Sequence, residues 1–379
     1  MINFLKKYLS ITIHVLVLFS LIFLTIVLSI LKTNSDIAEW WTKNVAALYA
    51  TVTSRLTGWI PFSLTEVTFI SLAILIIILT IQIIKKLIKK EFTNAILRGF
   101  IIINSIIGLI FTYTFTCELA YNRKPVDLPY YETKVEKEEY KDIYNYFVDD
   151  LNYCIDNLLF TDDGDVSTSS SVKEISSLVE DSYKVITSDY YNKSDAHAKP
   201  MISSLIYREL QITGVTFAPL TEANIDTLAT KIELPYVIAH ELAHTKGVMR
   251  EDDANQVAFY VCLNSDNEYL RFSAYALYFY QIRVMGTSTY MEEADRNELH
   301  QIDSRYVKAV RYASDYWKEH DLLGKIGDYI NNAYITSSGV KEGTGSYTGG
   351  TQVVQDPITY ELVPNKYQKL FFDKYYRNS

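Results

Sequence analysis

Three long apolar stretches lie in the N-terminal part of the chain, at about residues 11–31, 64–84 and 96–117. Each is long enough to cross a bilayer as an α-helix, which takes about 20 mostly apolar residues. The first stretch is not followed by a small-residue cleavage site, so we expect a retained helix rather than a signal peptide. The pattern predicts a transmembrane region over residues 1–120.

Lysine and arginine are distributed unevenly around these stretches. The short loop at residues 85–98 is crowded with cations, and two lysines precede the first stretch. The loop between the first two stretches holds fewer cations and three tryptophans, which are common at membrane interfaces. Because cationic loops stay in the cytoplasm, everything after Cys117 is predicted to lie outside.

Beyond the membrane region the pattern predicts mainly helices. Apolar residues recur at helical spacing over residues 134–159, and residues 268–284 and 295–321 are also predicted to be helical. A β-branched and aromatic run within residues 202–220 predicts one or two short strands. We therefore expect a mostly helical α+β domain over residues 121–334. A Gly/Ser-rich linker and a Tyr-rich tail are expected over residues 335–379.

The segment from Pro235 to Leu263 contains His240-Glu241-Leu242-Ala243-His244, an H-E-x-x-H pattern. Residues four apart lie on one helix face, so the two imidazoles can bind one metal ion. Glu241 leans toward the same side, where it can accept a proton from a zinc-bound water. The pattern also occurs by chance on ordinary helices, but Pro235 in a first helical turn and the E-x-x-A-N segment at residues 251–255 favour a zinc site.

A catalytic zinc needs a third protein ligand and one open position, and Glu251 is the first candidate for the ligand. On an unbroken helix Glu251 would lie about 10 Å beyond His244. Gly247 removes this difficulty, because glycine is the usual residue just past a helix end. The sequence thus predicts a helix, a turn, and a second helix that begins near Glu251, with Asn255 on the same face. The neighbouring residues Asp252 and Asp253 remain alternative ligands.

These residues resemble the DUF3810 family of bacterial membrane proteins, in which a transmembrane block precedes a zincin-like domain. HELAH followed closely by REDDAN carries the resemblance, together with residues 217–224 before the helix. The E-x-x-A-N segment is also similar to the third-ligand helix of gluzincin peptidases. The resemblance implies Zn²⁺ as the cofactor, His240, His244 and Glu251 as ligands, and Glu241 as the general base.

The resemblance also implies roles outside the motif. Gly214 and residues 216–218 would belong to an edge strand that holds the substrate backbone by strand addition. Gluzincin-like enzymes often use a later His, Tyr or Arg to stabilise the oxyanion of the tetrahedral intermediate. The candidates for this catalytic role are His300, Arg305 and Tyr306, and for each of them a surface role is the alternative.

Composition limits the partners. The net charge of −9, with no basic patch outside the juxtamembrane loops, argues against nucleic acid as a partner. Cys154 and Cys262 could form a disulfide in an oxidising compartment, although an apolar, unpaired cysteine is the default for Cys262.

The expected function is a zinc metallopeptidase of the bacterial cytoplasmic membrane, a multi-pass protein whose C-terminal domain hydrolyses envelope or extracellular polypeptides. One alternative is a zinc-binding, non-hydrolytic sensor or scaffold that binds envelope peptides. The other is a structural membrane protein in which the H-E-x-x-H pattern is accidental. The sequence identifies neither the substrate nor the oligomeric state.

The predicted orientation can be tested with a single cysteine placed in the loop at residues 161–171. A membrane-impermeant thiol reagent added to intact cells should label it, because the cation distribution places this loop outside. The control is a single cysteine in the loop at residues 85–98, which should react only after lysis. The reverse labelling pattern would invert the orientation.

Overall fold

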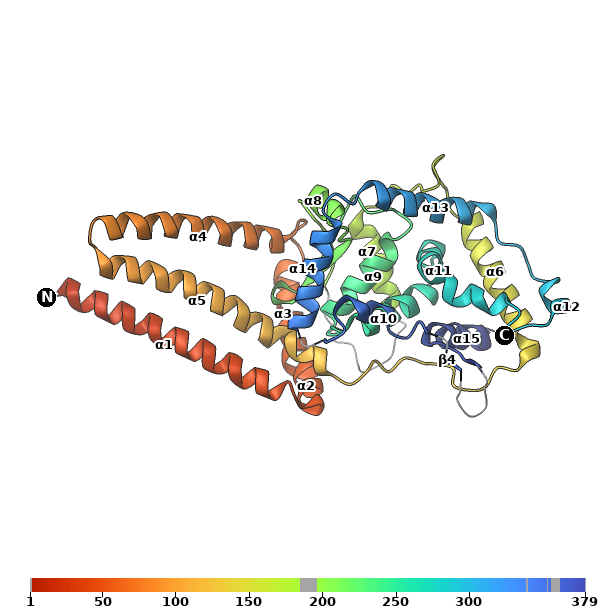
Figure 1. Ribbon diagram of the computed structural model, residues 1–379, viewed down its shortest axis with the longest axis horizontal. Helices are drawn as coiled ribbons and strands as arrows, with labels where there is room; N and C mark the ends of the chain where they lie inside the picture. Colours follow the sequence, from red (N-terminus) through yellow and green to blue (C-terminus); the bar gives the residue numbers. More distant parts are fainter. Residues whose placement is uncertain (1, 185–195, 339, 353, 356–361, 379) are drawn as a thin grey trace.

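Three long helices form one end of the molecule and the remaining elements gather at the other (Figure 1). The computed structural model describes residues 2–184, 196–338, 340–352, 354–355 and 362–378. The long helices are α1 (Ile2–Leu31), α4 (Leu64–Ile88) and α5 (Phe92–Thr116). All three contain a segment long and apolar enough to cross a membrane, so the three predicted apolar helices are confirmed as candidate membrane spans.

The loop after α1 is largely helical and lies where the long helices meet the domain. It contains α2 (Ser35–Trp41), a π-helix (Thr42–Ala46) and α3 (Ala47–Thr57). The Tyr49 hydroxyl of α3 donates a 2.7 Å hydrogen bond to the carbonyl of Pro219 in the domain. This segment therefore forms part of the contact between the long helices and the domain.

A buried carboxylate joins the domain to the first turn of α4. The Glu222 side chain accepts hydrogen bonds of 2.8 Å from both the backbone N–H and the hydroxyl of Thr65. Its other oxygen lies 2.5 Å from the ammonium of Lys199, and both charged side chains are almost fully buried. Since a helix N-terminus has free N–H groups and a positive dipole end, a carboxylate is favoured there.

A small mixed sheet lies beside the buried helices. Its strands are β1 (Ala198–Pro200), β2 (Gly214–Phe217) and β3 (Glu222–Ile225), in the order β1-β3-β2. β1 runs parallel and β2 antiparallel to β3. Within the described residues β2 is an edge strand, as the family resemblance implied for Gly214 and residues 216–218.

Helices surround α9 (Leu234–Thr245), which carries the H-E-x-x-H residues and is buried along its whole length. α7 (Val172–Tyr183), α10 (Glu251–Leu263) and α11 (Glu268–Arg283) pack against it. α6 (Tyr140–Asp156) packs on the far side of α11. Pro235 lies in the first turn of α9, where a missing N–H costs nothing.

The C-terminal segment belongs to this core. α15 (Lys366–Asn378) buries three aromatic side chains and a leucine in the main apolar cluster. The Lys374 ammonium of α15 lies 2.6 Å from Asp150 of α6, which also pairs with Arg271 of α11. The residues expected to be a separate tail thus pack between helices of the domain.

The remaining elements lie around the core. They include α8 (Ser204–Glu209), α12 (Glu293–Arg296), α13 (Ser304–Glu319) and α14 (Gly324–Ser337). β4 (Val354–Gln355) pairs antiparallel with β5 (Leu362–Val363). The domain boundary expected at residue 334 falls inside α14, which lies at the junction with the long helices (Figure 1). Cys154 and Cys262 are both free and buried, so the suggested disulfide between them is absent.

Removing the Glu222 carboxylate should destabilise the protein strongly. Glu222→Ala leaves the buried Lys199 ammonium without its charge partner, a change that typically costs about 3–5 kcal/mol. The control is Glu132→Ala, because Glu132 pairs with Lys369 on the surface, where an ion pair contributes about 0–1 kcal/mol. Thermal unfolding of the detergent-solubilised protein measures both. Equal decreases in unfolding temperature for the two variants would show that the buried Glu222–Lys199 pair does not stabilise the protein more than a surface pair.

Candidate metal centre

A chain reversal brings three potential ligand side chains together. α9 ends at Thr245, Gly247 adopts a φ of 82°, and α10 begins at Glu251. The helix break predicted at Gly247 is therefore confirmed. Because of it, the first residue of α10 lies beside the last turns of α9 instead of extending away from them.

The turn is fixed to the membrane-proximal segment by Arg123. Its guanidinium donates a 2.9 Å hydrogen bond to the Gly247 carbonyl and forms a two-pronged ion pair with Glu39 of α2. The Arg123 side chain is almost completely buried. A bidentate guanidinium–carboxylate pair is directionally specific, so it holds the turn in one position.

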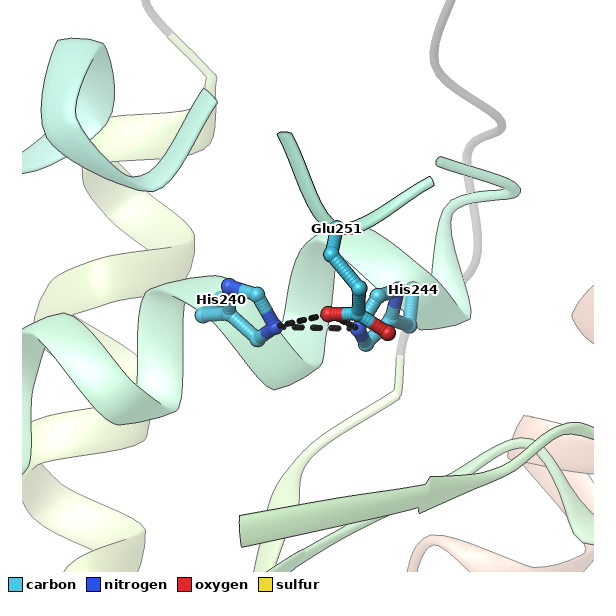
Figure 2. A group of neighbouring side chains, drawn as sticks. All are labelled: His240, His244 and Glu251. Atoms are coloured by element: carbon cyan, nitrogen blue, oxygen red, sulfur yellow. Dashed lines mark hydrogen bonds and ion pairs between the residues drawn. The ribbon is translucent and has the colours of Figure 1, made fainter. Parts of the chain in front are cut away.

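The three ligand atoms lie at separations that suit one metal ion. The Nε2 atoms of His240 and His244 are 3.0 Å apart, and the nearer carboxylate oxygen of Glu251 lies 3.2 and 3.5 Å from them. Two ligand atoms on a tetrahedral zinc, each bonded at about 2.0–2.1 Å, are about 3.3 Å apart. Figure 2 shows Glu251 reaching from α10 toward the two imidazoles of α9.

Hydrogen bonding orients one of the imidazoles for metal binding. Nδ1 of His244 lies 2.7 Å from the carbonyl oxygen of Val248, so Nδ1–H donates there and Nε2 faces the cluster. Such a bond from the outer nitrogen to a carbonyl is typical of metal-bound histidines. Nδ1 of His240 is buried and has no hydrogen-bond partner within the described part of the chain.

The electrostatics of the cluster favour a positive charge at its centre. Burial lowers the pKa of His244, but the charge of Glu251 and its hydrogen bond outweigh burial and raise that pKa to about 9. Burial raises the pKa of Glu251, yet the two imidazoles hold it well below its usual range. Two neutral imidazoles with facing lone pairs would repel each other, so the group needs a proton or a metal ion between them.

Glu241 lies beside the cluster and is held by the edge strand. The Thr216 hydroxyl lies 2.8 Å from both a carboxylate oxygen and the backbone carbonyl of Glu241, and can donate to either. A side chain at Gly214 would place its Cβ 2.6 Å from Cγ of Glu241, so glycine is required for this close approach. Burial raises the pKa of Glu241, against the opposing effect of the histidines.

The aspartates next to Glu251 have other partners. Asp253 is buried and pairs with Arg250, and Asp252 lies partly exposed near Gly349. Asn255, expected to support a ligand, instead accepts a hydrogen bond from Tyr236 and donates one to the Tyr347 carbonyl. The structure thus brings Glu251 alone of the three carboxylates to the histidines.

The oxyanion candidates from the later helical region do not reach the cluster. His300 lies half-exposed and pairs with Asp149 of α6. Arg305 pairs with Asp303 and Asp156, and Tyr306 is buried with its ring stacked on Phe279. We therefore correct the assignment of His300 and Tyr306 as catalytic groups, because α13 and the loop before it pack on α6 and α11, away from the metal centre.

Tyr347 lies beside the ligand residues, where His300, Arg305 and Tyr306 do not reach. Its ring stacks on His240 at 6.3 Å between centroids, and the Asn331 amide donates a 3.3 Å hydrogen bond to its hydroxyl. Burial, followed by the charge of Glu251, raises the pKa of Tyr347 far above its usual value. Tyr347 lies in a 3₁₀ helix (Gly343–Thr348) within the stretch expected to be a linker. The composition of this stretch did not indicate that it contacts α10, which lies nearly a hundred residues earlier in the chain.

A cavity of about 750 Å³ opens onto the cluster. Its lining includes every residue of β2 and the side chains of His240, Glu241, His244, Glu251 and Tyr347. Most of the other lining side chains are apolar or aromatic. A concave, largely apolar site with a few convergent polar groups is the usual form of a ligand-binding site.

The chain matches one description among known protein families over most of its length. The family model described as "Protein of unknown function (DUF3810)" covers residues 41–354. Comparisons with curated proteins and with solved structures give no match.

The ligand set can be tested by zinc affinity in three charge-removing variants. Glu251→Gln should weaken zinc binding by more than about 100-fold, since loss of a group that only supports a ligand costs about 10–100-fold. Asp252→Asn and Asp253→Asn, the matched controls, should stay within about tenfold of the wild type. Competition with a chromogenic chelator gives the affinities. Wild-type affinity in Glu251→Gln together with loss of zinc in an aspartate variant would assign the third ligand to that aspartate.

Proposed function

The chain belongs to the DUF3810 family, and we propose that it is a membrane-anchored zinc peptidase. In this proposal His240, His244 and Glu251 hold the zinc and Glu241 is the general base. The observation that carries it is the convergence of the three buried ligand atoms, with Glu241 beside them, at the end of a cavity walled by an edge strand. A chance H-E-x-x-H pattern would not require the third group or the cavity.

The donor set suits zinc. Two imidazole nitrogens and one carboxylate oxygen form the protein ligand set typical of catalytic zinc in peptidases, and all three residues line the cavity. Calcium and magnesium prefer sites made of oxygen ligands only. A zinc ion bound there would polarise the scissile carbonyl and allow water to attack it at neutral pH.

The residues around the ligands supply the proton transfer and the alignment. Glu241 accepts the proton of the attacking water and delivers it to the leaving amine. Glu241 lines the cavity beside the ligands, so one carboxylate is in position for both proton transfers. Thr216 keeps the carboxylate in place, and β2 can pair with the backbone of an extended peptide.

Tyr347 is the proposed oxyanion donor. Its high pKa keeps the phenol protonated, so the hydroxyl can donate a hydrogen bond to the oxygen that becomes negative in the transition state. The Asn331 amide donates a hydrogen bond to that hydroxyl and so helps to hold it in place. The aromatic ring also covers His240 and limits water around the ligands.

We place the domain on the outer face of a bacterial cytoplasmic membrane, with envelope or extracellular polypeptides as substrates. The three apolar helices support the anchoring, and the cation-rich turn between α4 and α5 supports the orientation.

Removing the Glu241 carboxylate should abolish hydrolysis without removing zinc. Glu241→Gln keeps the size of the side chain but cannot accept the proton, and general acid–base catalysis typically contributes about 10²–10⁴-fold. The measurement compares peptides released by membranes from wild-type and variant cells, together with zinc content. If wild type and Glu241→Gln release identical peptides while both hold zinc, the protein is a non-hydrolytic zinc-binding sensor or scaffold.

A pair of tyrosine variants tests the oxyanion assignment in the same assay. Tyr347→Phe should slow hydrolysis by about 10²–10³-fold, the usual effect of losing one oxyanion donor. Tyr306→Phe is the matched control and should keep the wild-type rate, because its ring packs on Phe279 away from the cavity. Slow hydrolysis by Tyr306→Phe together with a wild-type rate for Tyr347→Phe would instead assign the oxyanion donor to Tyr306 of α13.

A further inference from the structure

The cavity at the metal centre continues into the membrane helices. Thr65 and Phe69 of α4 line it, as do Leu109, Ile110 and Tyr113 of α5. The same space therefore touches the ligand residues at one end and two membrane spans at the other. A peptidase that took only water-soluble peptides would have no use for this second end.

The end of the cavity that α4 and α5 line lies at the depth where the hydrocarbon layer of the bilayer begins. Each of α4 and α5 has 25 residues, which corresponds to a length of about 37 Å against about 30 Å of hydrocarbon. Phe69 and Ile110 lie about 8–9 Å from the domain ends of their helices at 1.5 Å per residue. These two side chains thus reach the outer margin of the hydrocarbon layer.

Both helices leave apolar surface exposed where they line the cavity. α4 and α5 diverge as they approach the domain, whereas a tight turn joins their other ends (Figure 1). Phe69 and Ile110 line the cavity and still leave 45% and 46% of their surface uncovered. An apolar chain lying in the bilayer can therefore contact side chains that also line the cavity.

The edge strand links this apolar surface to the catalytic group. Gly214, at one end of β2, lies against Glu241, and Phe217, at the other end, packs on Phe69 with 5.0 Å between ring centroids. Three residues of strand span about 10 Å. A backbone paired along β2 would thus place one peptide bond at the metal centre and its continuation, three or four residues on, between α4 and α5.

We propose that the substrate is a membrane-anchored polypeptide, cleaved within a few residues of its apolar segment, with that segment seated between α4 and α5. This inference rests on the peptidase function proposed above. The free edge of β2 favours a polypeptide over a lipid molecule, because backbone pairing needs peptide groups. Anchoring in the same bilayer also raises the effective concentration of the substrate at the site.

The first experiment uses the full chain in zinc-containing proteoliposomes and two synthetic peptides. Both carry the same polar segment of mixed sequence, and one continues into an apolar segment of about 20 leucine and alanine residues. The anchored peptide should be cleaved at least about tenfold faster, at bonds within about four residues of the apolar segment. Equal rates, or cuts far from the apolar segment, would overturn the inference.

Variants at this apolar surface separate cavity effects from general membrane effects. Phe69→Asn and Ile110→Asn should each slow cleavage of the anchored peptide by about tenfold or more, since burying an unpaired amide against an apolar chain is costly. The matched controls are Ile70→Asn and Ile106→Asn, which alter exposed residues on the same helices outside the cavity lining. Equal losses in all four variants would count against a seat between α4 and α5.

Photocrosslinking from residue 110 in Glu241→Gln protein identifies the occupant without catalysis. Capture of the anchored peptide supports the inference, and capture of bilayer lipid alone, with the peptide present, contradicts it. Capture of the anchored peptide, without any cleavage by the wild type, would support binding between α4 and α5 but refute the peptidase function. Cleavage of both peptides at equal rates, without capture of the anchored peptide, would refute binding between α4 and α5 but not the peptidase function.

Discussion

The site depends on holding one buried carboxylate against two buried imidazoles. Such a group is costly unless a positive charge neutralises it, so the surrounding structure must both exclude water and leave room for a cation. The reversal at Gly247 brings Glu251 of α10 back to α9, and Arg123 fixes the turn from the membrane side. The complete burial of α9 then prevents the histidines from turning away toward solvent.

The part of the site that the sequence predicted is the part built from local geometry. His240, Glu241 and His244 lie on one helix, and the glycine that ends this helix is also visible in the sequence, so the position of Glu251 followed. The three apolar helices could also be predicted from the sequence, because each is one continuous apolar segment. Helix periodicity and helix ends need only neighbouring residues.

What the sequence did not predict arises from contacts between distant segments. Tyr347 reaches His240 through the docking of a Gly-, Ser- and Thr-rich stretch on α10 and α14, and composition alone favours a linker there. His300 and Tyr306 were chosen by residue type and position after the motif, but the packing of α13 decides where they lie. The shared cavity is likewise invisible in the sequence, since Phe69 and Ile110 resemble any other lipid-facing residues.

The position of α15 has a consequence for the order in which the protein is made. Its aromatic residues fill the core against α6, α10 and α11, and Tyr367 packs on Phe259 of the same helix that begins with Glu251. A ribosome completes residues 366–378 only after the membrane helices and the ligand residues have been synthesised. Until then α10 lacks part of its support, so the ligand residues gain their final rigidity only after the C-terminal helix has been synthesised and packed.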